Sequence, residues 1–311
     1  MQTSLGAVTQ PAMATEGTSG AADSIGFIGL GLLGQAMALR LAAQGCALIV
    51  WNREPERSDA LAAAGATVAA SPREVAQRCR VVCLCVLDAN AVHAVMFGAD
   101  GVAGAAPRER IVVDFSTIDP DETRAIATQA AAAGVAWVDA PVSGGPAAAA
   151  DGTLTVMVGG KPDVVNRIDA IVRRVAGKVT HVGDVGSGQA MKVINQALVG
   201  ATFVLLAETL ALVRSLGLPA HAVPSCLEGG LADSVALQRA WPRMVNEDFS
   251  PPTGRAGQML KDLKNVDALA RAGGLDLQLL ATATAQYAAH VDTGVGGDET
   301  LSISRLYAPR V

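Results

Sequence analysis

Three polar side chains, those of Lys192, Asn195 and Gln196, stand in an otherwise apolar segment, and offsets of three and four residues place them on one face of a helix. Burying a charged lysine among apolar residues costs free energy unless its ammonium group is paired or takes part in chemistry. A lysine of this kind can serve as a general acid or base. The alternative is a lysine whose stem packs on its neighbours while its head reaches water. Because three polar groups converge, we expect a functional lysine.

A glycine pattern, G-x-G-x-x-G, follows the apolar run 25–28 and precedes a helical pattern. In such a strand–turn–helix unit the first glycine makes the turn, the second lets the backbone approach a pyrophosphate, and the third lets helix and strand pack closely. The helix start attracts phosphate. A glycine-rich turn without a ligand is the alternative, but the strand–helix alternation downstream favours a dinucleotide site. The residues predicted to bind it here are Gly29, Leu30, Gly31, Leu32, Leu33 and Gly34.

The second expected strand, 47–51, ends at Asn52 and Arg53, at the position where the adenosine ribose of a dinucleotide lies. Enzymes that use NAD usually carry an acidic residue there to bind the ribose 2′-hydroxyl. Here a neutral asparagine is followed by a guanidinium, which can pair a 2′-phosphate with two hydrogen bonds. The alternative is an exposed arginine at a helix start. The pattern therefore predicts NADP in preference to NAD.

Alternating strand and helix patterns continue to about residue 186 and predict an α/β fold with a doubly wound parallel sheet. Ligands bind at the carboxyl ends of such strands, where Leu87 and Thr117 fall, Leu87 at the end of an expected strand 81–87. From 186 to 217 the chain reads as one helix about 45 Å long. Its middle is apolar on nearly all sides, so it must pack against other helices or another subunit.

Everything after this helix is helical in pattern, including 219–227, 233–239, 257–272 and 278–290. We therefore predict a Rossmann-type N-terminal domain at 24–186 and an all-α C-terminal domain at 187–311. Residues 1–23 show no periodicity and no signal-peptide pattern, which predicts a disordered extension.

The composition excludes several classes of protein. Half of the residues are hydrophobic and the net charge is −5, so nothing favours a nucleic-acid partner. No apolar run approaches the roughly 18 residues that would span a membrane. The five cysteines form no disulfide-like framework, which fits a reducing cytoplasm, and no His/Cys/carboxylate cluster indicates a metal.

A further turn, Ser143-Gly144-Gly145, follows the expected strand 135–138. Backbone N–H groups and a hydroxyl in such a turn can bind a small anion, for example a carboxylate. An ordinary Gly-Gly turn is the alternative.

With these motifs in order, residues 24–310 resemble the β-hydroxyacid dehydrogenases, the family of 3-hydroxyisobutyrate dehydrogenase, and within it the tartronate semialdehyde reductase branch. The resemblance rests on the stretches 26–31, 139–145, 186–196 and 261–263. Departures are Leu87-Asp88 where many members have Leu-Pro, Ala148 where many have glycine, and Gln196 where the family has a second asparagine.

The resemblance implies roles for individual residues. Lys192 matches the catalytic lysine, Ser143 to Gly145 match the carboxylate-binding turn, and Asn195 and Gln196 match the polar pair beside the substrate. Thr117 and Lys261 match positions at the nicotinamide end of the cofactor. The family also implies dimers or tetramers built around the long helix.

The implied reaction is NADP-dependent reduction of a short semialdehyde acid to a hydroxyacid. Three alternatives share the architecture: a decarboxylating 6-phosphogluconate dehydrogenase, an imine reductase and a non-catalytic NADP sensor. The chain is short for a decarboxylating 6-phosphogluconate dehydrogenase. The lysine at position 192 argues against an imine reductase and against a non-catalytic sensor.

Overall fold

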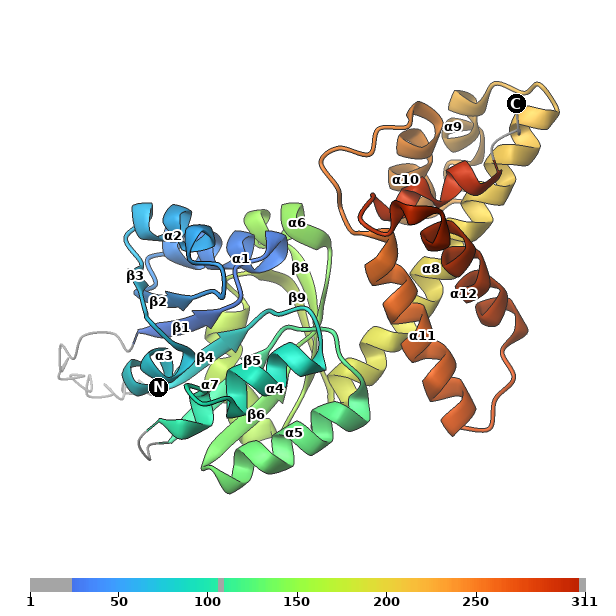
Figure 1. The fold of residues 1–311 in the computed structure, drawn as a ribbon. Helices are drawn as coiled ribbons and strands as arrows, with labels where there is room; N and C mark the ends of the chain where they lie inside the picture. Colours follow the sequence, from blue (N-terminus) through green and yellow to red (C-terminus); the bar gives the residue numbers. More distant parts are fainter. Residues whose placement is uncertain (1–23, 106–108, 308–311) are drawn as a thin grey trace, which may run out of the picture.

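The computed structural model describes residues 24–105 and 109–307, so the predicted disordered extension at 1–23 lies outside the described residues. Figure 1 shows a sheet flanked by helices and, beside it, a helical domain. The long helix α8 (Ser187–Ser215) begins against the sheet and runs through the helical domain. The fold class is the one predicted, an α/β Rossmann-like domain followed by helices.

Within the described residues, the sheet has the strand order β3-β2-β1-β4-β5-β6-β8-β7, and β9 pairs with β8. The first six strands run parallel, whereas β8 is antiparallel to β6 and β7 and parallel to β9. The predicted parallel sheet is therefore mixed beyond β6. The strands are β1 (Ile25–Ile28), β2 (Leu48–Trp51), β3 (Thr67–Val68), β4 (Val81–Leu84), β5 (Arg110–Asp114), β6 (Val135–Asp139), β7 (Val142–Ser143), β8 (Leu154–Gly159) and β9 (Ala176–Gly183).

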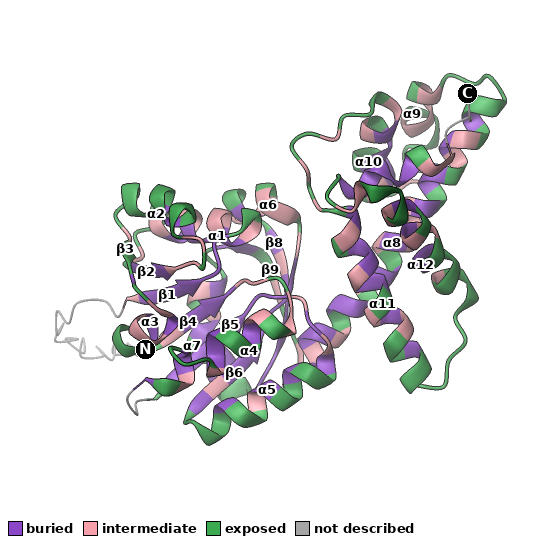
Figure 2. Ribbon diagram, viewed as in Figure 1, coloured by how far each residue is buried: buried purple, intermediate pink, exposed green. Residues whose placement is uncertain are grey.

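Helices cover both faces of this sheet, which explains why its central strands are apolar throughout. Figure 2 shows the buried residues concentrated in the strands and in the helix faces against them. Side chains alternate along β1, so that Phe27 joins one core and Ile28 the other. The helices on the Phe27 side include α1 (Leu32–Ala43), α2 (Asp59–Ala63), α6 (Gly145–Asp151) and α7 (Pro162–Val172); those on the Ile28 side are α3 (Pro72–Arg78), α4 (Ala89–Phe97) and α5 (Pro120–Ala132).

The expected strand 81–87 is shorter in the structure. β4 ends at Leu84, and the N–H of Val86 donates to the Ser116 hydroxyl at 3.0 Å rather than to a strand. Leu87 is left exposed at the carboxyl edge of the sheet. The sequence could not distinguish this loop from a strand because its residues are as apolar as those of β4.

The helical domain packs around α8, which contacts α10, α11 and α12. Its helices are α9 (Val223–Leu227), α10 (Val235–Asn246), α11 (Ala256–Ala272) and α12 (Gln278–His290), followed by a 3₁₀ segment (Thr300–Tyr307). The expected helix 233–239 begins later and runs longer. The Ser234 hydroxyl caps its start by accepting from the N–H of Leu237, and the buried side chains of Trp241 and Met244 extend it past Pro242.

One side of α8 is uncovered in the single chain. Exposed apolar side chains recur along it at helical spacing, and we call them the α8 stripe: Met191, Ile194, Leu198, Leu205, Leu212 and Leu216. The sequence predicted that the apolar middle of this helix packs against other helices or another subunit; within one chain, other helices cover only one side of it. The expectation that no apolar run approaches membrane-spanning length is wrong for α8, which by length and composition is the one helix among the described residues that could cross a membrane; 44% of the tested segment is buried inside the protein.

Candidate functional site

The glycine turn after β1 has the shape that a dinucleotide requires. Gly29 has a φ of +94°, and a Cβ there would lie 2.3 Å from the Cys85 carbonyl oxygen. A Cβ on Gly34 would lie 2.0 Å from the Gly29 carbonyl oxygen, whereas a Cβ on Gly31 would meet nothing within 4 Å. Two glycines therefore permit close packing, and the third leaves open space at the start of α1, where a pyrophosphate would fit.

The end of β2 is tied to this turn by Asn52. Its side-chain oxygen accepts from the N–H of Leu30 at 2.8 Å, and its Nδ2 donates to both the backbone carbonyl and the carboxylate of Glu54 at 3.0 Å. The Arg53 side chain is 84% exposed, and its guanidinium lies 3.0 Å from the same carboxylate. The Arg53 hydrogen bond, with help from Asn52, lowers the pKa of Glu54.

Lys192, Asn195 and Gln196 come together as the sequence predicted. Lys192 is 7% exposed, and its Nζ donates to the Gln196 side-chain oxygen at 2.8 Å. The Asn195 amide donates to that oxygen at the same distance, and Gln196 Nε2 donates to the Asp262 carboxylate at 2.7 Å. Burial lowers the pKa of Lys192 to about 8; the negative charge of Asp262 opposes this shift and the positive charge of Lys261 adds to it. The lysine can therefore change protonation state near neutral pH.

Lys261 joins the helical domain to the carboxyl edge of the sheet. Its Nζ donates to the backbone carbonyls of Thr117 at 2.8 Å and Leu87 at 3.3 Å, and it lies 3.4 Å from Asp262 Oδ1. An open cavity of about 450 Å³ lies beside it, lined in part by Leu87, Asp88 and Arg255. Two predicted cofactor residues, Leu87 and Lys261, therefore line one cavity, and Thr117 is hydrogen-bonded to the second of them.

Buried side chains at the first turn of α8 hold the two domains together. Asp139, at the end of β6, accepts from the N–H groups of Gly186 at 2.8 Å and Gln189 at 3.0 Å. Burial raises the pKa of Asp139. Gln189 in turn donates to the Ser116 carbonyl oxygen at 2.7 Å. These bonds fix where α8 leaves the sheet, and so where Lys192 lies.

The turn Ser143–Gly145 links β7 to α6. Gly144 and Gly145 have φ values of +131° and +72°, conformations that favour glycine. A Cβ on Gly145 would lie 3.4 Å from the Thr253 carbonyl oxygen, so this turn faces the helical domain. Within the described part of the chain, no hydrogen bond or ion pair joins the turn to Lys192.

Sequence reasoning left three polar residues near these groups unassigned. Glu54 lies just past the end of β2, where an acidic side chain is itself a sequence signal for a ribose 2′-hydroxyl. Asp262 stands beside Lys261 in the sequence, yet its link to Lys192 runs through a side chain 66 residues away. Gln189 gave no signal of its own.

Comparison with known proteins decides the family. Residues 24–183 match the model of the NAD binding domain of 6-phosphogluconate dehydrogenase, and residues 186–307 match the model described as NAD-binding of NADP-dependent 3-hydroxyisobutyrate dehydrogenase. The chain belongs to the β-hydroxyacid dehydrogenase family. It is therefore an NAD(P)-binding oxidoreductase of the hydroxyacid type, as the motifs predicted.

Individual relatives agree. The 2-hydroxy-3-oxopropionate reductase of Escherichia coli (strain K12) is 35% identical over 275 residues, which cover 88% of this chain and 93% of the relative. The L-threonate dehydrogenase of Cupriavidus necator is 31% identical, with 91% and 96% covered. The solved structure of Mycobacterium tuberculosis 3-hydroxyisobutyrate dehydrogenase with L-serine superposes with a TM-score of 0.82 at 28% identity, covering 92% of this chain and 99% of that one.

Proposed function

We propose that this β-hydroxyacid dehydrogenase reduces a short aldehyde acid to a hydroxyacid with Lys192 as the general acid. The observation that carries the proposal is the buried ammonium of Lys192, which is hydrogen-bonded to Gln196 and has a pKa lowered to about 8. A group that titrates near the working pH is suited to give and take a proton.

The proposed chemistry needs a hydride, which a bound nicotinamide supplies to the carbonyl carbon. As negative charge develops on the carbonyl oxygen, the Lys192 ammonium stabilises it and transfers a proton, so that the product is a hydroxyl group and the lysine becomes a neutral amine. Water then reprotonates the amine. The turn Ser143–Gly145 holds the substrate carboxylate and Asn195 and Gln196 lie beside the substrate, which fixes the carbon that faces the hydride. In the reverse direction Lys192 is the base.

The residues that would hold the cofactor are the glycine turn, Asn52 and Arg53 at the adenosine end, and Leu87, Thr117 and Lys261 at the nicotinamide end. The exposed guanidinium at the end of β2 supports NADP as the preferred form, because it can turn from its surface ion pair with Glu54 toward a 2′-phosphate. The Glu54 carboxylate beside it opposes this preference, since it repels phosphate and could accept a hydrogen bond from a 2′-hydroxyl.

The substrate that we propose is tartronate semialdehyde or a close three- or four-carbon analogue. Support comes from the chain's similarity to the protein named 2-hydroxy-3-oxopropionate reductase. We further propose a homodimer or homotetramer in which the α8 stripe is covered by another copy, because a row of exposed leucines along one helix is typical of an association surface. The free thiols of the described cysteines support a reducing cytoplasm as its location.

Initial rates of NADPH and NADH oxidation test the proposal, measured with tartronate, methylmalonate and succinic semialdehydes and with glyoxylate. We expect one aldehyde acid to be reduced far faster than the others, with NADPH preferred. Equal catalytic efficiency with the two cofactors would contradict the role of Arg53. Binding of NADPH without turnover on any aldehyde acid would instead favour an imine reductase or a sensor.

A further inference from the structure

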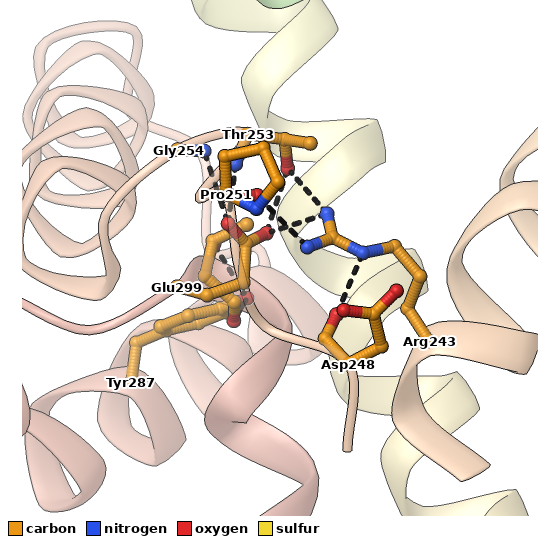
Figure 3. Close-up of polar contacts among 8 residues, drawn as sticks. Arg243, Asp248, Pro251, Thr253, Gly254, Tyr287 and Glu299 are labelled. Atoms are coloured by element: carbon orange, nitrogen blue, oxygen red, sulfur yellow. Dashed lines mark hydrogen bonds and ion pairs between the residues drawn. The ribbon is translucent and has the colours of Figure 1, made fainter. Parts of the chain in front are cut away.

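A buried carboxylate outside the site described above holds a loop of the helical domain in place. Glu299, whose side chain is fully buried, accepts from the N–H and the hydroxyl of Thr253, the latter at 2.7 Å, and from the N–H of Gly254 at 3.4 Å (Figure 3). A buried charge is stable only when it is paired and hydrogen-bonded, and here both carboxylate oxygens have donors.

Arg243 completes this clamp from α10. Its guanidinium lies 3.7 Å from Glu299, donates to the backbone carbonyls of Asp248 at 2.8 Å and Pro251 at 3.0 Å, and reaches the Thr253 hydroxyl at 3.4 Å (Figure 3). One arginine and one glutamate thus fasten several points along residues 247–255, the loop between α10 and α11. This many charge-assisted hydrogen bonds give a surface loop a single conformation.

The clamped loop lies against the predicted carboxylate turn. The Thr253 carbonyl oxygen would be 3.4 Å from a Cβ on Gly145, so the loop forms a wall beside that turn. Figure 1 shows the loop between α10 and α11 on the side of the helical domain that faces the sheet.

The same clamp fixes the start of α11. Arg255 pairs with Glu299 in an antiparallel bridge, and the N–H of Ala256 donates to the Asp298 carbonyl oxygen at 2.9 Å. Lys261 and Asp262 follow about one and a half turns further along this helix. The segment around Glu299 therefore meets the start of α11, whereas Lys261, further along that helix, is held by its own hydrogen bonds to the Thr117 and Leu87 carbonyls.

We propose that Glu299 is a positioning residue for substrate binding: with Arg243 it holds Thr253 and Gly254 as the wall beside the Ser143–Gly145 turn. This inference rests on the proposed function, because it takes that turn as the site of the substrate carboxylate. Glu299 itself touches neither substrate nor cofactor. Its loss weakens substrate binding by letting the wall move, while the cofactor turn after β1, in the other domain, is unchanged.

The variant Glu299→Gln keeps the shape of the side chain but removes its charge and turns an amide N–H₂ toward donors. We expect KM for the aldehyde acid and the dissociation constant of the product-like probe glycerate to rise about tenfold. The dissociation constant of NADPH should stay within about twofold. Hydrogen exchange at the Thr253 and Gly254 amides should become faster. Glu299→Asp, which keeps the charge, should recover part of the loss.

The matched control is Glu228→Gln, which removes an exposed carboxylate at the end of α9, in the same domain but outside the clamped loop. It should change neither KM nor exchange. If Glu299→Gln does not fold, Thr253→Val removes only the two hydrogen bonds of the Thr253 hydroxyl, to Glu299 at 2.7 Å and from Arg243 at 3.4 Å, and should raise KM about threefold.

Faster amide exchange with an unchanged KM and glycerate affinity would show that the clamp serves stability alone and would overturn the proposal. So would unchanged exchange at residues 253 and 254. A wild-type enzyme that reduces no aldehyde acid and binds no glycerate would refute the proposed function instead, and with it the substrate role of the clamp.

Discussion

The variant Asp262→Asn should move the pH dependence of the reaction in a defined direction. Asp262 is linked to Lys192 through the Gln196 amide, and its negative charge raises the pKa of that lysine against the effect of burial. With one amide between them the charges lie on the order of 6 Å apart, which corresponds to roughly 2–3 kcal/mol at an effective dielectric constant of about 20. Removing the charge should therefore lower the lysine pKa by about one to two units.

The direction of the pH effect follows from the role of the lysine. In the proposed mechanism reduction requires the ammonium form, so the wild-type kcat should be constant at low pH and fall as the pH rises through the Lys192 pKa of about 8. In Asp262→Asn the fall should begin about one to two pH units lower. Oxidation of the hydroxyacid requires the neutral amine and should show the mirror-image profile.

The assay is kcat for NADPH oxidation between about pH 5.5 and 10 at saturating cofactor and aldehyde acid. The matched control is Asp267→Asn, which removes a carboxylate from the same helix α11 beyond the site residues. An Asp262→Asn profile that superposes on the wild type, or that moves to higher pH, would refute the coupling of Asp262 to Lys192.

Three further changes test other parts of the mechanism and assembly. Lys192→Met should lower kcat at least about a thousandfold with NADPH affinity within about twofold. Because the lysine pKa falls from 10.5 to about 8 on folding, the lysine charge opposes folding below pH 8 and ceases to do so as the pH rises toward 10.5. Urea unfolding at pH 7 should therefore give Lys192→Met a free energy of unfolding higher than that of the wild type, by up to about 3 kcal/mol. A lower free energy of unfolding for the variant would contradict the cost of burying the lysine charge. Glu54→Gln should raise the NADPH-over-NADH ratio of kcat/KM several-fold, while the exposed control Glu56→Gln leaves it unchanged; no difference between the two would show that the Glu54 carboxylate does not act on the 2′ position. Leu205→Lys in the α8 stripe should shift the sedimentation coefficient toward that of a monomer, and an unaltered oligomer would place the interface elsewhere.

Local patterns predicted most of the sheet domain and the group around Lys192. The glycine turn was predictable because close packing and positive φ require glycine at fixed positions. The grouping of Lys192, Asn195 and Gln196 was predictable because helical spacing alone places them on one face. The end of β4 could not be read, since an apolar loop and an apolar strand have the same composition.

Long-range polar contacts were beyond reach. Glu299 and Thr253 are 46 residues apart, and nothing in either local sequence indicates that a buried carboxylate would meet a loop amide. The exposure of the α8 stripe could not be predicted either. An apolar helix face has the same sequence pattern whether it packs against its own chain or against another subunit. The Glu299–Thr253 contact and the exposure of the α8 stripe both depend on which segments pack together, and sequence periodicity does not identify those segments.

The most direct test of the central claim is the fate of the hydride. NADPH carrying deuterium at both C4 positions should be incubated with tartronate semialdehyde and the wild-type enzyme, and the product analysed by mass spectrometry and NMR. We predict one deuterium on the carbon that bears the new hydroxyl group, and no such product with Lys192→Met, although this variant still binds NADPH. Bound NADPH that transfers no deuterium to any aldehyde acid in the wild type would contradict the proposed reaction.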